Sequence, residues 1–339
     1  MAGAGCRRIP RCNRAGGSVD EFDIIRRFFT TAGSLRDDVL IGTGDDAAVL
    51  RVAEGYDLVS CSDTLVSGVH FRAGCSARAV GHKALAVNLS DLAAMGARPA
   101  WALLALTLPD ADADWLSHFA DGLLTLAERS GVALVGGDTT RGPLTVTITA
   151  HGLVPHGTAL RRRGARVGDR ICVTGTLGDA GLALQLQDQA ATALRARLDF
   201  PEPRIEAGLA LHGYATAVID ISDGLLADLG HLLEADQLGA RLNVDALPRS
   251  AAFLEVHASP GAGPNPAFHE LPLTAGDDYE LCFTVPPVHC GAIERRLELA
   301  GCPATVIGEI TDGPAIRCVQ ADGTPYSPAV AGYRHFAES

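Results

Sequence analysis

Aspartates recur in this sequence where one predicted element gives way to another, and carboxylates gathered in that way can bind cations. Some follow glycine turns and others stand at the ends of apolar strands or at a strand–helix junction. Side chains at such ends can converge on one cleft even when they are far apart in the chain. The six that we take as candidate metal ligands are Asp46, Asp63, Asp91, Asp138, Asp220 and Asp223.

Asp91 is the most informative of the six because the predicted helix around it is otherwise apolar. At 3.6 residues per turn it shares a face with Ala84, Val87 and Asn88. A buried ionised carboxylate costs several kcal/mol unless it is paired or binds a metal. A partner arginine or an exposed helix face is the alternative for Asp91. For Asp63 and Asp220, ordinary turn and capping chemistry is the alternative when each is considered singly.

Taken together, the six carboxylates favour a cation site that serves phosphate chemistry. Two carboxylates 4 Å apart repel by about 4 kcal/mol at an effective dielectric constant of about 20. Oxygen ligands select hard ions, so Mg²⁺ is favoured over zinc, and the eleven histidines show no His-x-x-x-His spacing. Mg²⁺ bound by few carboxylates completes its shell with water and substrate phosphates, so we expect the site to serve phosphoryl transfer.

Glycines and arginines offer further groups that could contact phosphate. The segments at 42–44 and 136–137 would let backbone N–H groups approach phosphate oxygens, and Arg141 and the run at 161–163 could clamp them. Glycine turns alone are a weak signal, and an arginine run is also typical of a solvated surface.

Composition excludes several classes of protein. The net charge of −12 argues against nucleic-acid binding. Lys83 is the only lysine and lacks the Gly-x-x-x-x-Gly-Lys spacing, so a P-loop mechanism is excluded. The nine cysteines form no Cys-x-x-Cys pair, and no run of 18 apolar residues exists. We therefore expect a cytoplasmic protein with no membrane contact.

Predicted strands and helices alternate along the chain, which favours an α/β or α+β fold. We expect a helix over 20–29, a long apolar helix over 77–95 closed by Gly96, and a half-buried strand over 144–153. The polar stretch 161–169 is the expected domain boundary. This gives a disordered leader at 1–18, an ATP- and Mg-binding domain at 19–160 and a C-terminal domain at 161–339.

Several ordered motifs resemble the thiamine-monophosphate kinase family. They run from about Glu21 to Phe336, so the resemblance covers nearly the whole chain after the leader, and several of the blocks are long. The blocks that carry it are Gly44-Asp-Asp-Ala-Ala-Val49, Ser62-Asp-Thr-Leu-Val-Ser-Gly-Val-His-Phe71, Lys83-Ala-Leu-Ala-Val-Asn-Leu-Ser-Asp-Leu-Ala-Ala-Met-Gly-Ala97, Gly136-Gly-Asp-Thr-Thr-Arg-Gly142, Val173-Thr-Gly-Thr-Leu-Gly178, Ile219-Asp-Ile-Ser-Asp-Gly-Leu225, Gly276-Asp-Asp-Tyr-Glu-Leu281 and Gly332-Tyr-Arg-His-Phe336.

This resemblance implies a fold, an activity and an assembly. The fold is the two-domain one of the purine-biosynthesis synthetase (PurM-like) superfamily, with an N-terminal α/β domain whose sheet pairs in a homodimer and a C-terminal α/β domain. The activity is direct, Mg-assisted, in-line transfer of a phosphoryl group from ATP to thiamine monophosphate, the final step of thiamine diphosphate biosynthesis. Several Mg²⁺ ions would bridge the phosphates.

The resemblance also assigns roles position by position. The metal ligands it implies are Asp46, Ser62, Asp63, Asp91, Asp138, Asp220 and Asp223, with Asp46, Asp91 and Asp220 at the centre of an ATP-dependent catalysis. The nucleotide contacts are Asp121, Gly137, Asp138, Arg162 and Ser222, and the thiamine-phosphate contacts are His70, Asp277 and Tyr333. Two positions depart from the pattern. Cys61 stands where Ser or Thr is expected among the metal contacts, so that its backbone carbonyl would serve. Asp277 replaces the more usual Glu.

Two alternatives stay open at this point. One is a sibling on the same scaffold, such as selenophosphate synthetase, aminoimidazole ribonucleotide synthetase or the hydrogenase-maturation dehydratase. Cys6 and Cys12 lie in a poor context for the first of these, and the chain lacks the C-terminal cysteine of the last. The other alternative is a non-catalytic nucleotide-binding regulator, against which the full set of six aspartates argues.

Overall fold

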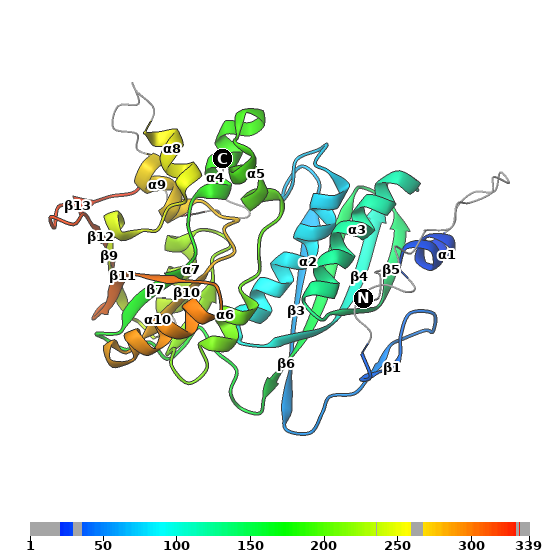
Figure 1. Ribbon diagram of the computed structural model, residues 1–339, viewed down its shortest axis with the longest axis horizontal. Helices are drawn as coiled ribbons and strands as arrows, with labels where there is room; N and C mark the ends of the chain where they lie inside the picture. Colours follow the sequence, from blue (N-terminus) through cyan, green and yellow to red (C-terminus); the bar gives the residue numbers. More distant parts are fainter. Residues whose placement is uncertain (1–20, 30–35, 235, 259–266, 330–331, 333–339) are drawn as a thin grey trace, which may run out of the picture.

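The computed structural model describes residues 21–29, 36–234, 236–258, 267–329 and 332. Two units lie side by side, each built around its own sheet, and helix α2 stands at the boundary between them (Figure 1). The expected leader at 1–18 falls outside the described residues. Among the residues described, no helix is long and apolar enough to cross a membrane.

The first unit holds a four-stranded sheet in the order β3-β6-β4-β5. Helices α2 and α3 cover one of its faces, and the β1-β2 ribbon packs against part of the other (Figure 1). In β6, residues alternate between buried and partly exposed, which confirms the half-buried strand expected there. The elements of this unit are α1 (Glu21–Ile24), a π-helical turn (Ile25–Phe29), β1 (Val39–Ile41), β2 (Val49–Leu50), β3 (Tyr56–Val66), α2 (Ala77–Ala94), β4 (Arg98–Leu108), α3 (Ala113–Arg129), β5 (Ala133–Arg141) and β6 (Thr145–Pro155).

Helix α2 is bounded by local signals and is buried on nearly all sides. The Ser76 side chain accepts a hydrogen bond from the Ala79 N–H at 3.2 Å, and Gly96 adopts a positive φ of 65° just past the helix, as expected for its end. Glycine also lets α3 approach closely, since a Cβ on Gly81 would lie 2.1 Å from the Phe119 carbonyl oxygen. Backbone-to-backbone packing thus fixes the helix that carries Asp91.

One expected turn is wrong. The glycine segment at 136–137 was expected to form a turn, but β5 continues through it to Arg141 in parallel pairing with β4. The pairing satisfies the backbone groups that a turn would have left to solvent or ligand. Gly137 is needed there because its φ is 145° and a Cβ would lie 1.8 Å from the Leu104 carbonyl oxygen.

The second unit holds a seven-stranded sheet in the order β13-β12-β9-β11-β7-β10-β8, antiparallel except between β9 and β12. Its strands are β7 (Arg170–Thr174), β8 (Ala217–Asp220), β9 (Gly239–Asn243), β10 (Leu281–Val285), β11 (Ala304–Thr311), β12 (Ile316–Val319) and β13 (Pro325–Tyr326). Its helices are α4 (Asp179–Leu186), α5 (Thr192–Asp199), α6 (Ile205–Ala210), α7 (Leu225–Glu234), α8 (Ala251–His257), α9 (Ala267–Thr274) and α10 (Cys290–Leu299). We had not predicted α5, α8 and α9.

Both faces of this second sheet are covered, which explains why β10 is buried along its whole length. Leucines of α7 and α9 pack on one face, while α6 and α10 pack on the other. Ala93 and Ala94 at the end of α2 join that second cluster, so the first unit contributes directly to the core of the second. The two units are therefore joined by apolar packing at the place where β8 ends and Asp220 stands.

Candidate active site

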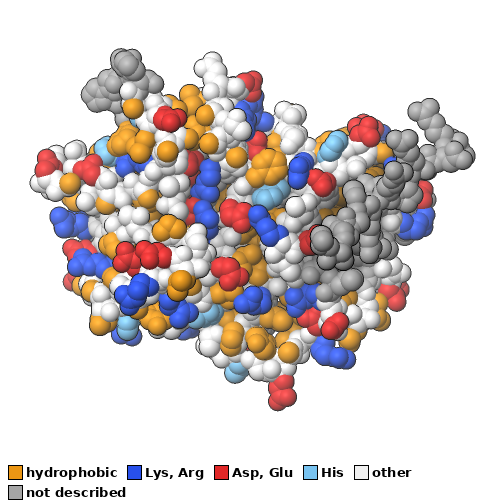
Figure 2. All heavy atoms as spheres, in the orientation of Figure 1, with side chains coloured by type: hydrophobic (Ala, Val, Ile, Leu, Met, Phe, Trp, Pro, Cys, Tyr) orange, Lys and Arg blue, Asp and Glu red, His pale blue; other side chains and the backbone are white. Residues whose placement is uncertain are grey.

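Three of the predicted ligands gather at the boundary between the units: Asp63 on β3, Asp91 on α2 and Asp220 at the end of β8. Burial, and then the charges of Asp220 and Asp63, raise the pKa of Asp91 to about 7. Burial likewise raises the pKa of Asp63 and of Asp220. Burial disfavours the ionisation of all three carboxylates, so a cation is needed for them to be charged together at neutral pH. Acidic and basic side chains both face outward along this boundary (Figure 2).

The donor set of this carboxylate centre fits Mg²⁺ because it offers oxygen alone. Within the part of the chain that is described, however, no three His, Cys, Asp or Glu side chains are placed to hold a metal ion by themselves. The two observations agree if the ion takes part of its shell from water and phosphate oxygens, as Mg²⁺ commonly does. These carboxylates suit an ion that arrives with a nucleotide.

Asp220 is 4% exposed and has a partner from the other unit. The Ser90 hydroxyl, one residue before Asp91 on α2, donates a hydrogen bond to Asp220 Oδ2 at 2.8 Å. The positive charge of Arg162 lowers the pKa of both Asp91 and Asp220, opposing the effect of burial. Of the arginine run, Arg162 is therefore the member whose charge acts on the centre, although its side chain is exposed.

The turn after β8 carries Ser222 and Asp223 and is held by a carboxylate that we had not singled out. Asp228, in the first turn of α7, accepts hydrogen bonds at Oδ2 from the N–H groups of Ser222, Asp223 and Gly224 at 3.0, 3.0 and 3.1 Å. Burial and then the charge of Asp220 raise the pKa of Asp228 to about 7. Its place four residues after Gly224 was the sequence signal, since an acidic residue early in a helix can bond the free N–H groups before it.

Asp46, Gly137 and Asp138 lie elsewhere, in a cavity of about 1400 Å³ in the first unit. The stretch at 43–48, which includes Gly44, and the end of β5 both line the cavity. Asp46 and Asp138 are both exposed. The chain thus divides its predicted ligands between this cavity and the carboxylate centre.

Three further predicted contacts, Asp121, Cys61 and Ser62, form ion pairs or hydrogen bonds within the chain. Asp121 on α3 forms an exposed ion pair with Arg78 at 3.0 Å and is not among the residues that line the large cavity. The Cys61 thiol donates to the Asn88 carbonyl oxygen at 3.3 Å, and burial raises its pKa far above the ordinary value. A protonated thiol is a poor metal ligand, which leaves the backbone carbonyl of Cys61 for that role. Ser62 donates to the Ile148 carbonyl oxygen at 3.2 Å.

Of the residues that the resemblance assigned to the substrate, His70 lines a smaller cavity of about 380 Å³ and Asp277 pairs with a residue of its wall. His70 lines it and accepts a hydrogen bond at Nδ1 from the Val66 N–H at 3.0 Å. Asp277 forms an ion pair with Lys83, which also lines this cavity, at 2.8 Å. Tyr333, the third residue of that assignment, lies outside the described residues.

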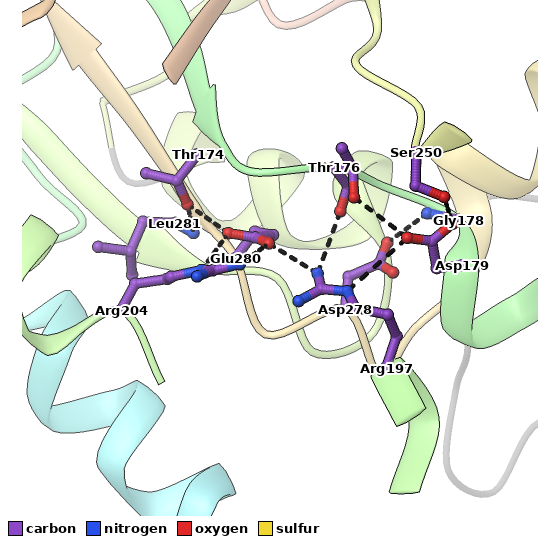
Figure 3. A network of polar contacts seen from close by, with 10 residues as sticks. All are labelled: Thr174, Thr176, Gly178, Asp179, Arg197, Arg204, Ser250, Asp278, Glu280 and Leu281. Atoms are coloured by element: carbon purple, nitrogen blue, oxygen red, sulfur yellow. Dashed lines mark hydrogen bonds and ion pairs between the residues drawn. The ribbon is translucent and has the colours of Figure 1, made fainter. Parts of the chain in front are cut away.

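The segment that carries Asp277 is backbone-strained and firmly anchored. Asp277 and Tyr279 have positive φ values of 68° and 49°, which non-glycine residues adopt only when the surroundings impose them. Glu280, fully buried, follows at once, and Figure 3 shows Arg197, Arg204 and Thr174 directed at its carboxylate. The distances are 2.7 Å to Arg197, 2.5 and 2.6 Å to Arg204, and 2.7 Å to Thr174. Sequence reasoning missed this network because arginines on an unpredicted helix and loop supply it.

Comparison with known proteins places this geometry in context. The model of the AIR synthase related protein N-terminal domain matches residues 44–154, and that of the C-terminal domain matches residues 166–319. The thiamine-monophosphate kinase of Escherichia coli K12 is 47% identical over 326 residues, which cover 94% of this chain and 98% of that protein.

Solved structures agree with those matches. The crystal structure of thiamine-monophosphate kinase from Stenotrophomonas maltophilia K279a has a TM-score of 0.79 at 46% identity and covers 86% of this chain and 93% of its own. A structure described as AaThiL complexed with AMPPCP and TMP has a TM-score of 0.71 at 32% identity and covers 84% and 89%.

Proposed function

Because this chain belongs to the thiamine-monophosphate kinase family, we propose that it transfers the γ-phosphoryl group of ATP to thiamine monophosphate and so forms thiamine diphosphate. A phosphate oxygen of thiamine monophosphate forms a bond to the γ-phosphorus. The bond between the γ-phosphorus and the bridging oxygen breaks, and ADP leaves with the electron pair. The structural observation that supports this reaction is the meeting of Asp91 from one unit with Asp220 from the other in one carboxylate centre.

The residues of the chain that would hold Mg²⁺ are the carboxylates of that centre, with Asp46, Asp138 and Asp223 as further candidates. When bound, Mg²⁺ would neutralise the charge of the phosphate oxygens, which is most of what phosphoryl transfer requires. The chain itself orients the reactants and opposes the negative charge. Ser90 holds Asp220 in place, Asp228 holds the turn of Ser222 and Asp223, and Arg162 supplies positive charge beside them.

For the nucleotide we propose the large cavity of the first unit. Its lining combines exposed Asp46 and Asp138 with Gly44, Gly136 and Gly137, whose backbone a phosphate group can approach closely. Its volume of about 1400 Å³ leaves room for a base, a ribose and three phosphates. For Gly137 we propose a spacing role, because its lack of a side chain allows β5 to pass the Leu104 carbonyl and carry Asp138 to the cavity.

For thiamine monophosphate we propose the smaller cavity lined by His70. Its apolar wall suits the rings of thiamine, and it adjoins the segment of Asp277. The contact expected from Tyr333 belongs to the same proposal, as an aromatic ring that stacks on thiamine. Tyr333→Ala should then weaken the binding of thiamine monophosphate more than the binding of ATP. Equal weakening of the binding of both would indicate a role in folding.

Assembly, domain limits and location form a further proposal. β3 is an edge strand of the first sheet and exposes Tyr56 and Leu58 by 47% and 51%, so we propose that two copies pair along it. Leu58→Lys should shift the mass measured by light scattering from dimer to monomer.

We keep 19–160 and 161–339 as the two domains. A cytoplasmic location suits the seven cysteines of the described residues, all of which are free thiols.

The direct test is an assay with ATP, Mg²⁺ and thiamine monophosphate that follows thiamine diphosphate by chromatography. Product formation that EDTA abolishes is the expected result. A protein that consumes ATP only with another acceptor would belong to a sibling activity on this scaffold. A protein that binds ATP and transfers nothing would be the regulator considered above.

A further inference from the structure

Lys83 is the only lysine of the chain, and it is placed where an anion could be bound. It lies in α2, its side chain is 6% exposed, and it lines the smaller cavity together with His70. A buried ammonium group must be paired or used, because removing it from water costs several kcal/mol. The buried ammonium group of Lys83 must therefore be stabilised by a partner in the protein or by a bound ligand.

The ion pair with Asp277 uses only part of the hydrogen-bonding capacity of the Lys83 ammonium group. Lys83 Nζ lies 2.8 Å from Asp277 Oδ1, and the Tyr279 hydroxyl donates to the same oxygen at 3.1 Å. An ammonium group carries three N–H donors. Across the described residues, Asp277 is the one partner found for Nζ. Two donors therefore remain for a ligand that enters the cavity.

The other charges around the cavity are largely compensated. Arg72 forms an ion pair with Asp188 at 3.2 Å, and Arg195 lies 3.9 Å from the same carboxylate. Burial raises the pKa of Asp199, and the positive charges of Arg195 and Lys83 oppose that shift. Because Asp199 also lines the cavity, the charge of Lys83 acts within it. Phe71, Val80 and Leu198 are among the apolar residues of its wall. Apolar residues and cations thus line the cavity together, which suits a ring system that carries a single phosphate, and Lys83 is the most buried of the three cations.

The base of this cavity also adjoins the carboxylate centre. The Asp277 N–H donates to the Ser222 carbonyl oxygen at 2.9 Å, and Ser222 follows Asp220 by two residues. On the other side, the charge of His70 acts on Asp63. An acceptor phosphate at Lys83 would thus lie on the side of the cavity that faces the candidate metal ligands, where a γ-phosphoryl group must arrive.

From these contacts we propose that Lys83 binds the phosphate group of thiamine monophosphate, with Asp277 holding the ammonium group in position. The proposal rests on the proposed function, since it names the residue that recognises the acceptor's phosphate. Lys83 distinguishes the phosphorylated vitamin from free thiamine, which has the same rings and no anion to bind.

The test compares the binding of thiamine monophosphate and of free thiamine by titration calorimetry. Lys83→Met should weaken the binding of thiamine monophosphate by at least about tenfold, because one charge-assisted contact is lost. It should change the affinity for thiamine by less than about threefold. Arg129→Met is the matched control, because it removes one cation from an exposed ion pair with Glu202 and should alter neither affinity. Equal weakening of both ligands by Lys83→Met, or of neither, would overturn the proposal.

Two further measurements cover a variant that folds poorly. Lys83→Met combined with Asp277→Asn removes the whole ion pair, and the preference for thiamine monophosphate over thiamine should still be lost. In the unmodified protein, acetylation of Lys83 by a succinimidyl ester, read by mass spectrometry, should be slowed by thiamine monophosphate and not by thiamine. Equal protection by both ligands would contradict a phosphate contact. An unmodified protein that neither binds nor phosphorylates thiamine monophosphate would instead refute the proposed function.

Discussion

Ser90 and Asp220 are 130 residues apart in the chain, and the hydroxyl of one donates a 2.8 Å hydrogen bond to the carboxylate of the other. The bond joins the long helix of the first unit to the strand end of the second. It gives a buried carboxylate a neutral donor, which favours the charged form of that carboxylate against the effect of burial. The carboxylate centre is thus a product of the interface between the units.

Removal of that hydroxyl is the first test of the interface. Ser90→Ala should lower the free energy of unfolding by about 1–3 kcal/mol, because Asp220 would keep its burial and lose its donor. Urea unfolding followed by circular dichroism measures the change. Thr145→Ala removes an exposed hydroxyl bonded to a backbone carbonyl and should change stability by less than about 0.5 kcal/mol. Similar values for the two variants would show that the Ser90 contact contributes nothing specific.

Neutralising the centre should abolish catalysis and leave the fold. Asp91→Asn and Asp220→Asn should each lower kcat by about 100-fold or more, because charge that stabilises the bound phosphates is lost. Circular dichroism should show an unchanged spectrum. Asp312→Asn, at an exposed turn, serves as the control. Near-normal turnover in both variants would refute a metal-binding centre here.

The repulsion among these carboxylates should appear as a pH dependence of stability when metal is removed. The pKa of Asp91 in the folded chain, about 7, exceeds the ordinary 3.8, so its ionisation opposes folding as the pH rises between those values. In EDTA, the stability advantage of Asp91→Asn over the unmodified protein should therefore be larger at pH 8 than at pH 4.5 by at least about 1 kcal/mol. Urea unfolding at both pH values measures this difference, and a gap that does not change with pH would contradict the assigned repulsion.

The buried network around Glu280 should be a large contributor to stability. Glu280→Ala would leave Arg197 and Arg204 without their shared carboxylate and should destabilise the protein by about 3–5 kcal/mol. Glu309→Ala breaks a half-exposed pair with Arg170 and should cost less than about 1 kcal/mol. Thermal unfolding compares the two. Because Glu280 anchors the strained segment of Asp277, a Glu280 variant that still folds should also show a raised KM for thiamine monophosphate. An unaltered KM would separate the network from the substrate site.

Local patterns were enough to predict the elements whose own residues define them. The apolar run and Gly96 specify α2, and the alternation of Thr with apolar residues specifies β6. The α/β character of both units was also predicted correctly. The prediction was wrong where strand pairing overrides local preference. Gly136 and Gly137 were predicted to form a turn, but their backbone groups pair with β4 and they belong to strand β5. Helix α9 includes Pro272, a residue that argues against a helix, and was missed.

The sequence by itself determined which residues could bind metal and phosphate, because residue type and position at element ends follow from the chain alone. Only the tertiary structure decided how they group. It places Asp63, Asp91 and Asp220 at one boundary and Asp46 with Asp138 in a separate cavity. It also pairs Lys83 with Asp277 across 194 positions and buries Glu280 between two arginines. Such pairings depend on which surfaces of the two units meet, and packing between distant segments fixes that choice.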